Sequence, residues 1–119
     1  MNKAVLDEFG EEFIATIRDA SLQQFEKVVS AEMKDAESKR ISASLAKCTE
    51  EQLALIKEVA YTMVDVTLHN ILFFFEQGDV NGWKIANEEK GIKDLVAISD
   101  GLSGELLYRR GVDCEIQPL

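Results

Sequence analysis

The sequence predicts a mostly α-helical single domain: a helical bundle around a central helix at residues 50–76, followed by a small hairpin or turn-rich C-terminal region. An α+β arrangement is the alternative. Apolar residues recur every three or four positions over long stretches before residue 77, as on one face of an α-helix. Six of the seven glycines follow that point, and glycine favours turns over helices. We therefore expect a helical part at 1–77 and a glycine-rich mixed part at 78–119.

The length and composition favour one folded domain. The chain has 119 residues, of which 46% are hydrophobic and 29% are charged. Most domains contain about 100–150 residues, and this composition is too apolar for a disordered chain. A chain of this size buries about two-thirds of its unfolded surface, so we expect a core that needs no metal ion or disulfide.

The first long helix is expected at about residues 3–33. Its apolar stripe keeps helical spacing and continues after a small shift, through Leu6, Phe9, Phe13 and Ile17 and then Leu22, Phe25 and Val29. Acidic residues crowd its early turns, where they suit the positive helix N-terminus: Asp7, Glu8, Glu11 and Glu12. A shorter helix is expected at about residues 36–47, although its serines compete with the helical backbone.

The central helix has a clear start signal. Thr49 and Gln52 fit a capping box, in which each side chain binds the backbone amide of the other residue. The helix is expected to end near Glu76, before Gly78. One apolar face consists of Leu53, Ile56, Ala60, Met63, Thr67, Ile71 and Phe74, and a second consists of Leu55, Val59, Thr62, Val66 and Phe73. A helix that is apolar on two faces packs against neighbours on both sides, so we expect it at the centre of the core.

The turn-rich part is expected to contain a small hairpin near residues 83–92. Residues 79–82 have turn chemistry, residues 83–86 alternate as a short strand does, and residues 87–91 form a polar turn. Residues 94–98 fit either a strand or a helical turn. A last helix is expected after Ser99 or Asp100, through Tyr108.

The charge excludes several classes of function. Lys and Arg total 13 and Asp and Glu total 22, which gives a net charge of −9. This balance argues against direct binding of nucleic acid or of an anionic membrane surface. The most apolar run, residues 59–75, contains Asp65 and is too short to span a bilayer. With no export signal, Cys48 and Cys114 are expected to be reduced thiols, and the expected compartment is the cytoplasm.

Asp65 and His69 lie four positions apart on the central helix and share one face. Two interpretations are open: a general acid–base pair of a small enzyme, or a buried hydrogen-bonded pair inside the bundle. No nucleophile at a suitable spacing completes a catalytic set, and the cysteines offer no paired spacing for zinc. We therefore expect a structural pair, no enzymatic activity, no metal and no cofactor.

An acidic zone surrounds the single tryptophan. It combines Glu88 and Glu89 with neighbouring aspartates, and it is either a solvated surface beside a core tryptophan or a docking face with an exposed anchor. The candidate partner-binding residues are Trp83, Glu88, Glu89, Asp94 and Asp100. Successive helix residues step by about 100°, so the side chains of residues 73–75 cannot all face one way. At least one is expected to be exposed, or covered by the Trp83 segment or a second subunit.

Two stretches carry a resemblance to known proteins. Residues 65–73 follow the pattern D-x-T-x-H-x-x-L-F, and residues 98–106 read I-S-D-G-L-S-G-E-L. Together they resemble small acidic bacterial proteins that include immunity partners of polymorphic toxins and of contact-dependent growth inhibition toxins. The resemblance implies a cytoplasmic inhibitor of a cognate toxin. The acidic charge favours a basic toxin domain that attacks nucleic acid, because opposite charges accelerate association, and it argues against direct contact of this chain with nucleic acid or membrane. The alternatives are a non-catalytic helical adaptor or homo-oligomer, such as a homodimer, and an enzyme using Asp65 and His69.

Overall fold

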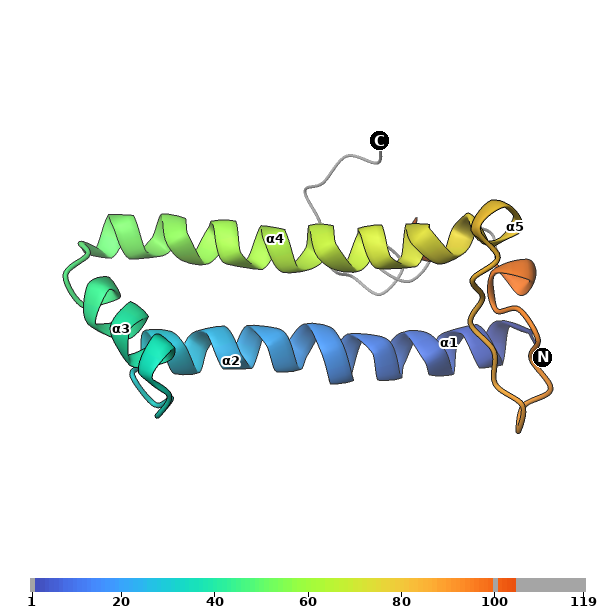
Figure 1. Cartoon of the computed structure of the whole chain (residues 1–119), viewed down its shortest axis with the longest axis horizontal. Coiled ribbons are helices and arrows are strands. Elements are labelled where there is room, and N and C mark those ends of the chain that lie inside the picture. Colours follow the sequence, from blue (N-terminus) through green and yellow to red (C-terminus); the bar gives the residue numbers. More distant parts are fainter. Residues whose placement is uncertain (1, 100, 105–119) are drawn as a thin grey trace.

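The computed structural model describes residues 2–99 and 101–104, and these residues form an elongated helical hairpin (Figure 1). One long helical rod runs along the molecule, a short helix crosses its far end, and a second long helix returns beside the first. The turn-rich segment then closes the end where the chain began. The mostly helical class expected from the sequence is confirmed.

The outgoing rod consists of three consecutive helical segments, α1 (Asn2–Phe13), a π-helical segment η1 (Ile14–Asp19) and α2 (Ala20–Val29). A π-helix adds one residue to a turn. The inward-facing residues therefore step by five positions, from Phe13 to Arg18, inside η1. This insertion is the physical cause of the small shift in the apolar stripe. The rod ends at Val29, four residues before the expected boundary at residue 33.

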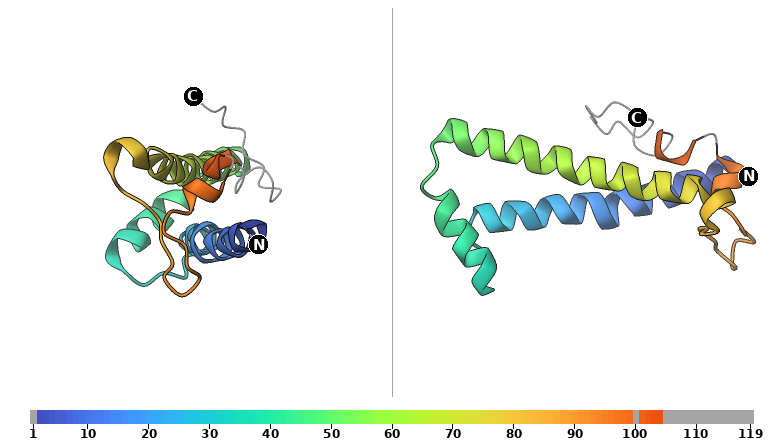
Figure 2. Two further views of the ribbon diagram at one scale, coloured as in Figure 1. Left: turned by 90° about the vertical axis from the view of Figure 1, so that its right-hand side faces the viewer. Right: turned by 45° about the horizontal axis from the view of Figure 1, so that its top comes forward.

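Helix α3 (Ala36–Leu45) crosses the far end of the hairpin at a steep angle (Figure 2). Asp35 caps it, because its carboxylate accepts a hydrogen bond from the Ser38 amide at 3.0 Å. The buried Ser42 hydroxyl donates to the Val28 carbonyl, which ties α3 to the end of α2.

Helix α4 (Glu50–Glu76) begins at the expected capping box. The Gln52 amide donates to the Thr49 hydroxyl at 3.1 Å, and the Thr49 amide donates to the Gln52 side-chain oxygen at 2.9 Å. The predicted start and end of this helix are both confirmed. No helix of the described residues has the length and apolar character needed to span a membrane.

The turn-rich segment contains α5 (Gly78–Asn81) and a short 3₁₀ helix, η2 (Val96–Ile98). Gly82 ends α5 in the left-handed conformation, with φ at +82°, which glycine adopts without strain. Residues 83–86 pair with no strand among the described residues, and the hairpin is reduced to one antiparallel bridge between Asn87 and Ile92. Most of the expected last helix, together with Cys114, lies outside the described residues.

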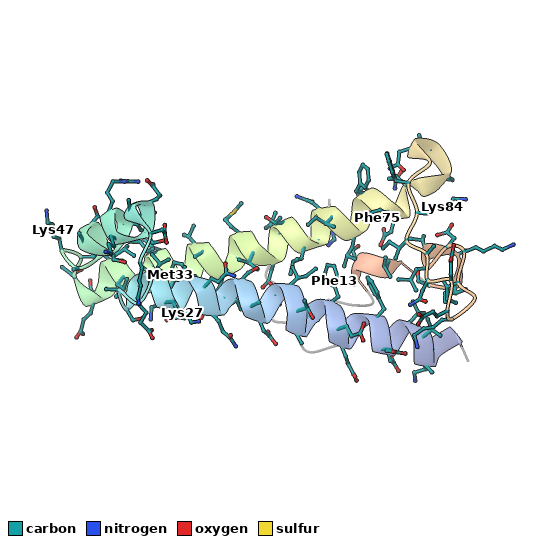
Figure 3. The ribbon with its side chains drawn as sticks, turned by 60° about the horizontal axis from the view of Figure 1, so that its bottom comes forward. Phe13, Lys27, Met33, Lys47, Phe75 and Lys84 are labelled. Carbon is teal, nitrogen blue, oxygen red and sulfur yellow. The ribbon has the colours of Figure 1, made fainter. Side chains whose placement is uncertain are left out.

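The core is small and lies at the turn-rich end. Its buried apolar side chains come from the rod, from α4 and from the closing segment: Leu6, Phe13, Leu68, Leu72, Leu95 and Leu102. Figure 3 shows Phe13 in the space between the two long helices. The closing segment therefore contributes Leu95 and Leu102 to the same cluster that joins α1 to α4.

The expectation that α4 is buried on two faces is wrong. Its buried residues are Asp65, Leu68 and Leu72, whereas large apolar side chains of both expected core faces are exposed: Leu55, Val59, Met63, Ile71, Phe73 and Phe74. The reason is geometric: among the described residues the rod is the one long helix beside α4, and the closing segment adds contacts at the C-terminal end of α4. Most of the helix is therefore covered along a single stripe. The expectation that at least one of Phe73–Phe75 is exposed is confirmed.

Truncation of Leu72 tests which face of α4 is buried. Leu72 is fully buried, so Leu72→Ala should lower the free energy of unfolding by about 2–5 kcal/mol in urea denaturation. Leu55 lies on the same helix with 60% of its surface exposed, and Leu55→Ala is the matched control, with an expected loss under about 0.5 kcal/mol when dilute protein is measured and the single chain unfolds. Equal losses at the two positions would contradict the assignment of the faces.

Candidate functional site

A buried ion pair joins the two long helices near the middle of the molecule. Arg18, in η1, donates through Nε to Asp65 Oδ1 at 2.6 Å and through Nη2 to Asp65 Oδ2 at 3.2 Å. The Asp65 side chain is 4% exposed and the Arg18 side chain is 18% exposed. Both oxygens of the carboxylate are therefore engaged by one guanidinium in a two-pronged contact.

This contact changes the interpretation of Asp65 and His69. Asp65 is the structural carboxylate that we expected, but its partner is Arg18 rather than His69. The His69 ring stacks on Phe73, with the centroids 6.4 Å apart and the planes within 7°. Its Nδ1 atom is buried and has no hydrogen-bond partner among the described residues. The expected hydrogen-bonded pair of Asp65 and His69 is therefore wrong, because both oxygens of the Asp65 carboxylate accept hydrogen bonds from Arg18 on the neighbouring helix.

A double-mutant cycle tests the ion pair. Arg18→Met leaves the Asp65 carboxylate buried without a cation, and breaking a buried pair in this way costs about 3–5 kcal/mol. Adding Asp65→Leu to that variant should restore much of the loss, because no uncompensated charge then remains. Urea denaturation measures all four members of the cycle, and strictly additive losses would show that the two groups do not interact.

A second polar contact joins α2 to α4 nearer the far end. The Tyr61 hydroxyl donates to Glu26 at 2.8 Å, and Lys57 approaches the other Glu26 oxygen at 3.3 Å. The hydrogen bond from Tyr61, reinforced by Lys57, lowers the pKa of Glu26 below its ordinary value of 4.5. The same bond raises the pKa of the Tyr61 hydroxyl.

The lowered pKa of Glu26 predicts a pH-dependent contribution to stability. A carboxyl with a depressed folded-state pKa stabilises the fold above its unfolded pKa, and this contribution is lost as the pH falls through the folded value. We expect Tyr61→Phe to be less stable than the wild type at neutral pH, with the difference shrinking as the pH falls below 4.5. Urea denaturation across the acid range measures this difference, and a constant gap would contradict the role of Glu26.

Trp83 is held by its backbone, while its side chain faces solvent with 65% of the residue exposed. The Trp83 amide donates to Asn81 Oδ1, and Asn81 Nδ2 donates to the Phe74 carbonyl, each at 2.8 Å. Asn81 therefore links the start of the loop to the end of α4. A Cβ atom at Gly78 would lie 2.7 Å from the Trp83 carbonyl oxygen, so the loop packs closely on α5.

The acidic turn at residues 87–91 lies against the first turns of α1. Lys90 forms an ion pair with Glu8 at 2.8 Å. The Lys90 pKa is raised above 10.5, first by this hydrogen bond and further by the charges of Glu12 and Glu89. Several carboxylates thus surround one lysine, and the local field is negative. The sequence analysis missed Glu8 and Glu12, because their place in the first helix was explained by the helix dipole alone.

A cavity of about 230 Å³ lies between α1 and this loop. Apolar side chains from both elements line it, including Val5, Phe9 and Ile85, together with Glu8, Glu12 and Lys90. The Lys90–Glu8 ion pair therefore lies at this cavity, which combines an apolar wall with one cation and two carboxylates.

The remaining candidate residues have different environments. Glu88 and Glu89 are exposed on the turn, as a docking role requires. Asp94 is half-buried, and its carboxylate accepts a hydrogen bond from the Val96 amide at 3.1 Å, so it supports the start of η2. Asp100 lies outside the described residues. The structure therefore gathers Trp83, Glu88 and Glu89 on one loop.

Among the described residues, no group of three or more His, Cys, Asp and Glu side chains is placed to bind a metal ion. Comparisons with protein-family models, with curated proteins and with solved structures found no match for this chain. The resemblance to immunity proteins therefore stays a prediction that rests on the two quoted sequence stretches.

Proposed function

We propose that this chain is an immunity protein, a non-catalytic inhibitor that binds a basic toxin domain acting on nucleic acid. The observation that carries this proposal is the exposed tryptophan on a fixed loop, next to an acidic turn. Trp83 is 65% exposed although the backbone around it is held by Asn81 and Gly78. Tryptophan is among the residues that contribute most to protein interfaces, since its large surface is buried at low entropic cost.

The charges at this end of the molecule support a cationic partner. Glu88 and Glu89 are exposed on the same loop as Trp83, and Glu8 and Glu12 add their carboxylates from α1. A negative field of this kind accelerates association with a basic protein and weakens as salt screens it. The adjacent cavity has apolar walls and contains Glu8, Glu12 and Lys90, so a lysine or arginine side chain of the partner competes there with Lys90 for the carboxylates.

A second candidate function is a helical adaptor or homo-oligomer. The observation that favours it is the exposed apolar surface of α4. An acidic inhibitor of a cationic partner does not need this apolar surface. The two functions use different surfaces, so one chain can perform both.

Co-expression with the product of the gene immediately upstream tests the immunity function. We expect that product to arrest growth when expressed alone, and this chain to restore growth and to form a one-to-one complex. Trp83→Ala should weaken the complex at least about 30-fold, the loss typical of an interface anchor. Glu88→Gln with Glu89→Gln should slow association at low salt about tenfold.

Glu50→Gln with Glu51→Gln is the matched control. These two glutamates are also adjacent and exposed, but they lie at the opposite end of the hairpin. Their substitution should lower the association rate far less than the same change at the acidic turn. The immunity function would be contradicted if the product of the upstream gene did not arrest growth, or if no complex formed even at low salt. Equal effects of the two double variants would remove the acidic turn from the interface.

A further inference from the structure

We propose that the exposed face of α4 binds the same face of a second copy of this chain, giving a symmetric dimer. The seam of this face consists of Ile56, Val59, Met63, Val66, Asn70 and Phe73. The inference goes beyond the immunity function and does not depend on it, because the seam does not include the loop that carries Trp83.

The seam residues have the spacing of helices that pack along their length. Successive positions differ by three, four, three, four and three residues, which is the heptad repeat of paired helices. In paired helices this spacing keeps every seam residue turned toward the partner helix. Within one chain, α4 turns a different stripe, containing Asp65, Leu68 and Leu72, toward the rod. Among the described residues, the heptad stripe is turned away from the rod: Val59, Met63, Asn70 and Phe73 are exposed, and Ile56 and Val66 are half-buried.

The exposed area is large enough for a stable contact. On α4, six large apolar side chains are between 41% and 60% exposed, including Val59 at 54% and Met63 at 53%. With ordinary side-chain areas they expose roughly 600 Å², the upper end for the largest apolar patch of a monomer. The neighbouring Thr62, Thr67 and Asn70 bring the face close to the roughly 800 Å² that each partner buries in a standard interface.

The charge pattern selects a second copy over a basic protein. Between Glu58 and Glu76, the only Asp, Glu, Lys or Arg is Asp65, and it is turned inward to Arg18. A cationic partner would gain nothing from a face without carboxylates. Two copies with a net charge of −9 each repel one another elsewhere on their surfaces, and this face lets them meet without placing like charges together.

The shape of the molecule supports the same partner. The radius of gyration is 17.2 Å, whereas a compact chain of this length has about 13.5 Å. Two helices side by side cover each other along one side, and Figure 2 shows the rod and α4 next to each other in the view along the hairpin. Two such hairpins packed through α4 complete a four-helix arrangement, in which each α4 is covered on both sides.

Asn70 gives the seam one polar position among apolar residues, and it is exposed in the single chain. A single asparagine in a helix seam fixes the register of the partners but lowers their affinity. Replacing Asn70 by an apolar residue should therefore tighten the dimer, and a variant that simply fails to fold cannot produce that result.

Sedimentation equilibrium of the full chain tests the proposal. We expect the wild type to approach twice the chain mass as its concentration rises. Val59→Glu should raise the dissociation constant at least about 100-fold, because two unpaired carboxylates would be buried. Asn70→Leu should lower the constant about tenfold. The matched control is Val80→Glu, the same change at a residue that is 82% exposed outside the seam, and it should leave the mass unchanged.

Circular dichroism of each variant confirms that the helices are intact before the masses are compared. A wild type that keeps the mass of one chain at every concentration would overturn the proposal. Equal effects of Val59→Glu and Val80→Glu on the dissociation constant would also overturn it. So would an Asn70→Leu variant whose dissociation constant is no lower than that of the wild type. The dimer and the immunity function fail separately, because Trp83→Ala should weaken toxin binding without changing the dimer.

Discussion

Two long helices that lie side by side can each bury one stripe of side chains against the other, and this limit governs the structure. The rod and α4 meet along a narrow contact that contains the Arg18–Asp65 ion pair and the stripe through Leu68 and Leu72. The π-helical segment η1 keeps that contact in register, since its extra residue brings Arg18 opposite Asp65. Among the described residues, the side chains on the opposite face of α4 are exposed or half-buried.

The same limit divides the molecule into two surfaces with different chemistry. At the turn-rich end, Leu95 and Leu102 enter the core and anchor a loop that presents Trp83 and the acidic turn on a rigid support. Along α4, the exposed residues form a continuous apolar face with no exposed carboxylate between Glu58 and Glu76. The first surface carries an exposed tryptophan and carboxylates, and the second is apolar.

The sequence predicted the local features well. The capping box at Thr49, the end of α4 before Gly78 and the turns after it depend on nearby residues, and all were recognised. The sequence did not predict which face of α4 is buried within the chain. Apolar periodicity shows which residues avoid water, but it does not show whether the helix that covers them belongs to the same chain. The heptad spacing from Ile56 to Phe73 was the sequence feature that could have indicated a second helix-packing face on α4. Glu8 could not be placed beside Lys90, since that contact joins residues 82 positions apart.

The central claim is that one face of α4 is buried within the chain and the opposite face is left for a second copy. Relaxation of leucine methyl resonances by a soluble gadolinium chelate tests it directly, in the wild type and in Val59→Glu. We expect the methyls of Leu68 and Leu72 to be protected in both proteins. The Leu55 methyls should be protected in the concentrated wild type and accessible in Val59→Glu. Leu55 methyls as protected as those of Leu72 in Val59→Glu would contradict the account, because α4 would then be covered on both faces by its own chain.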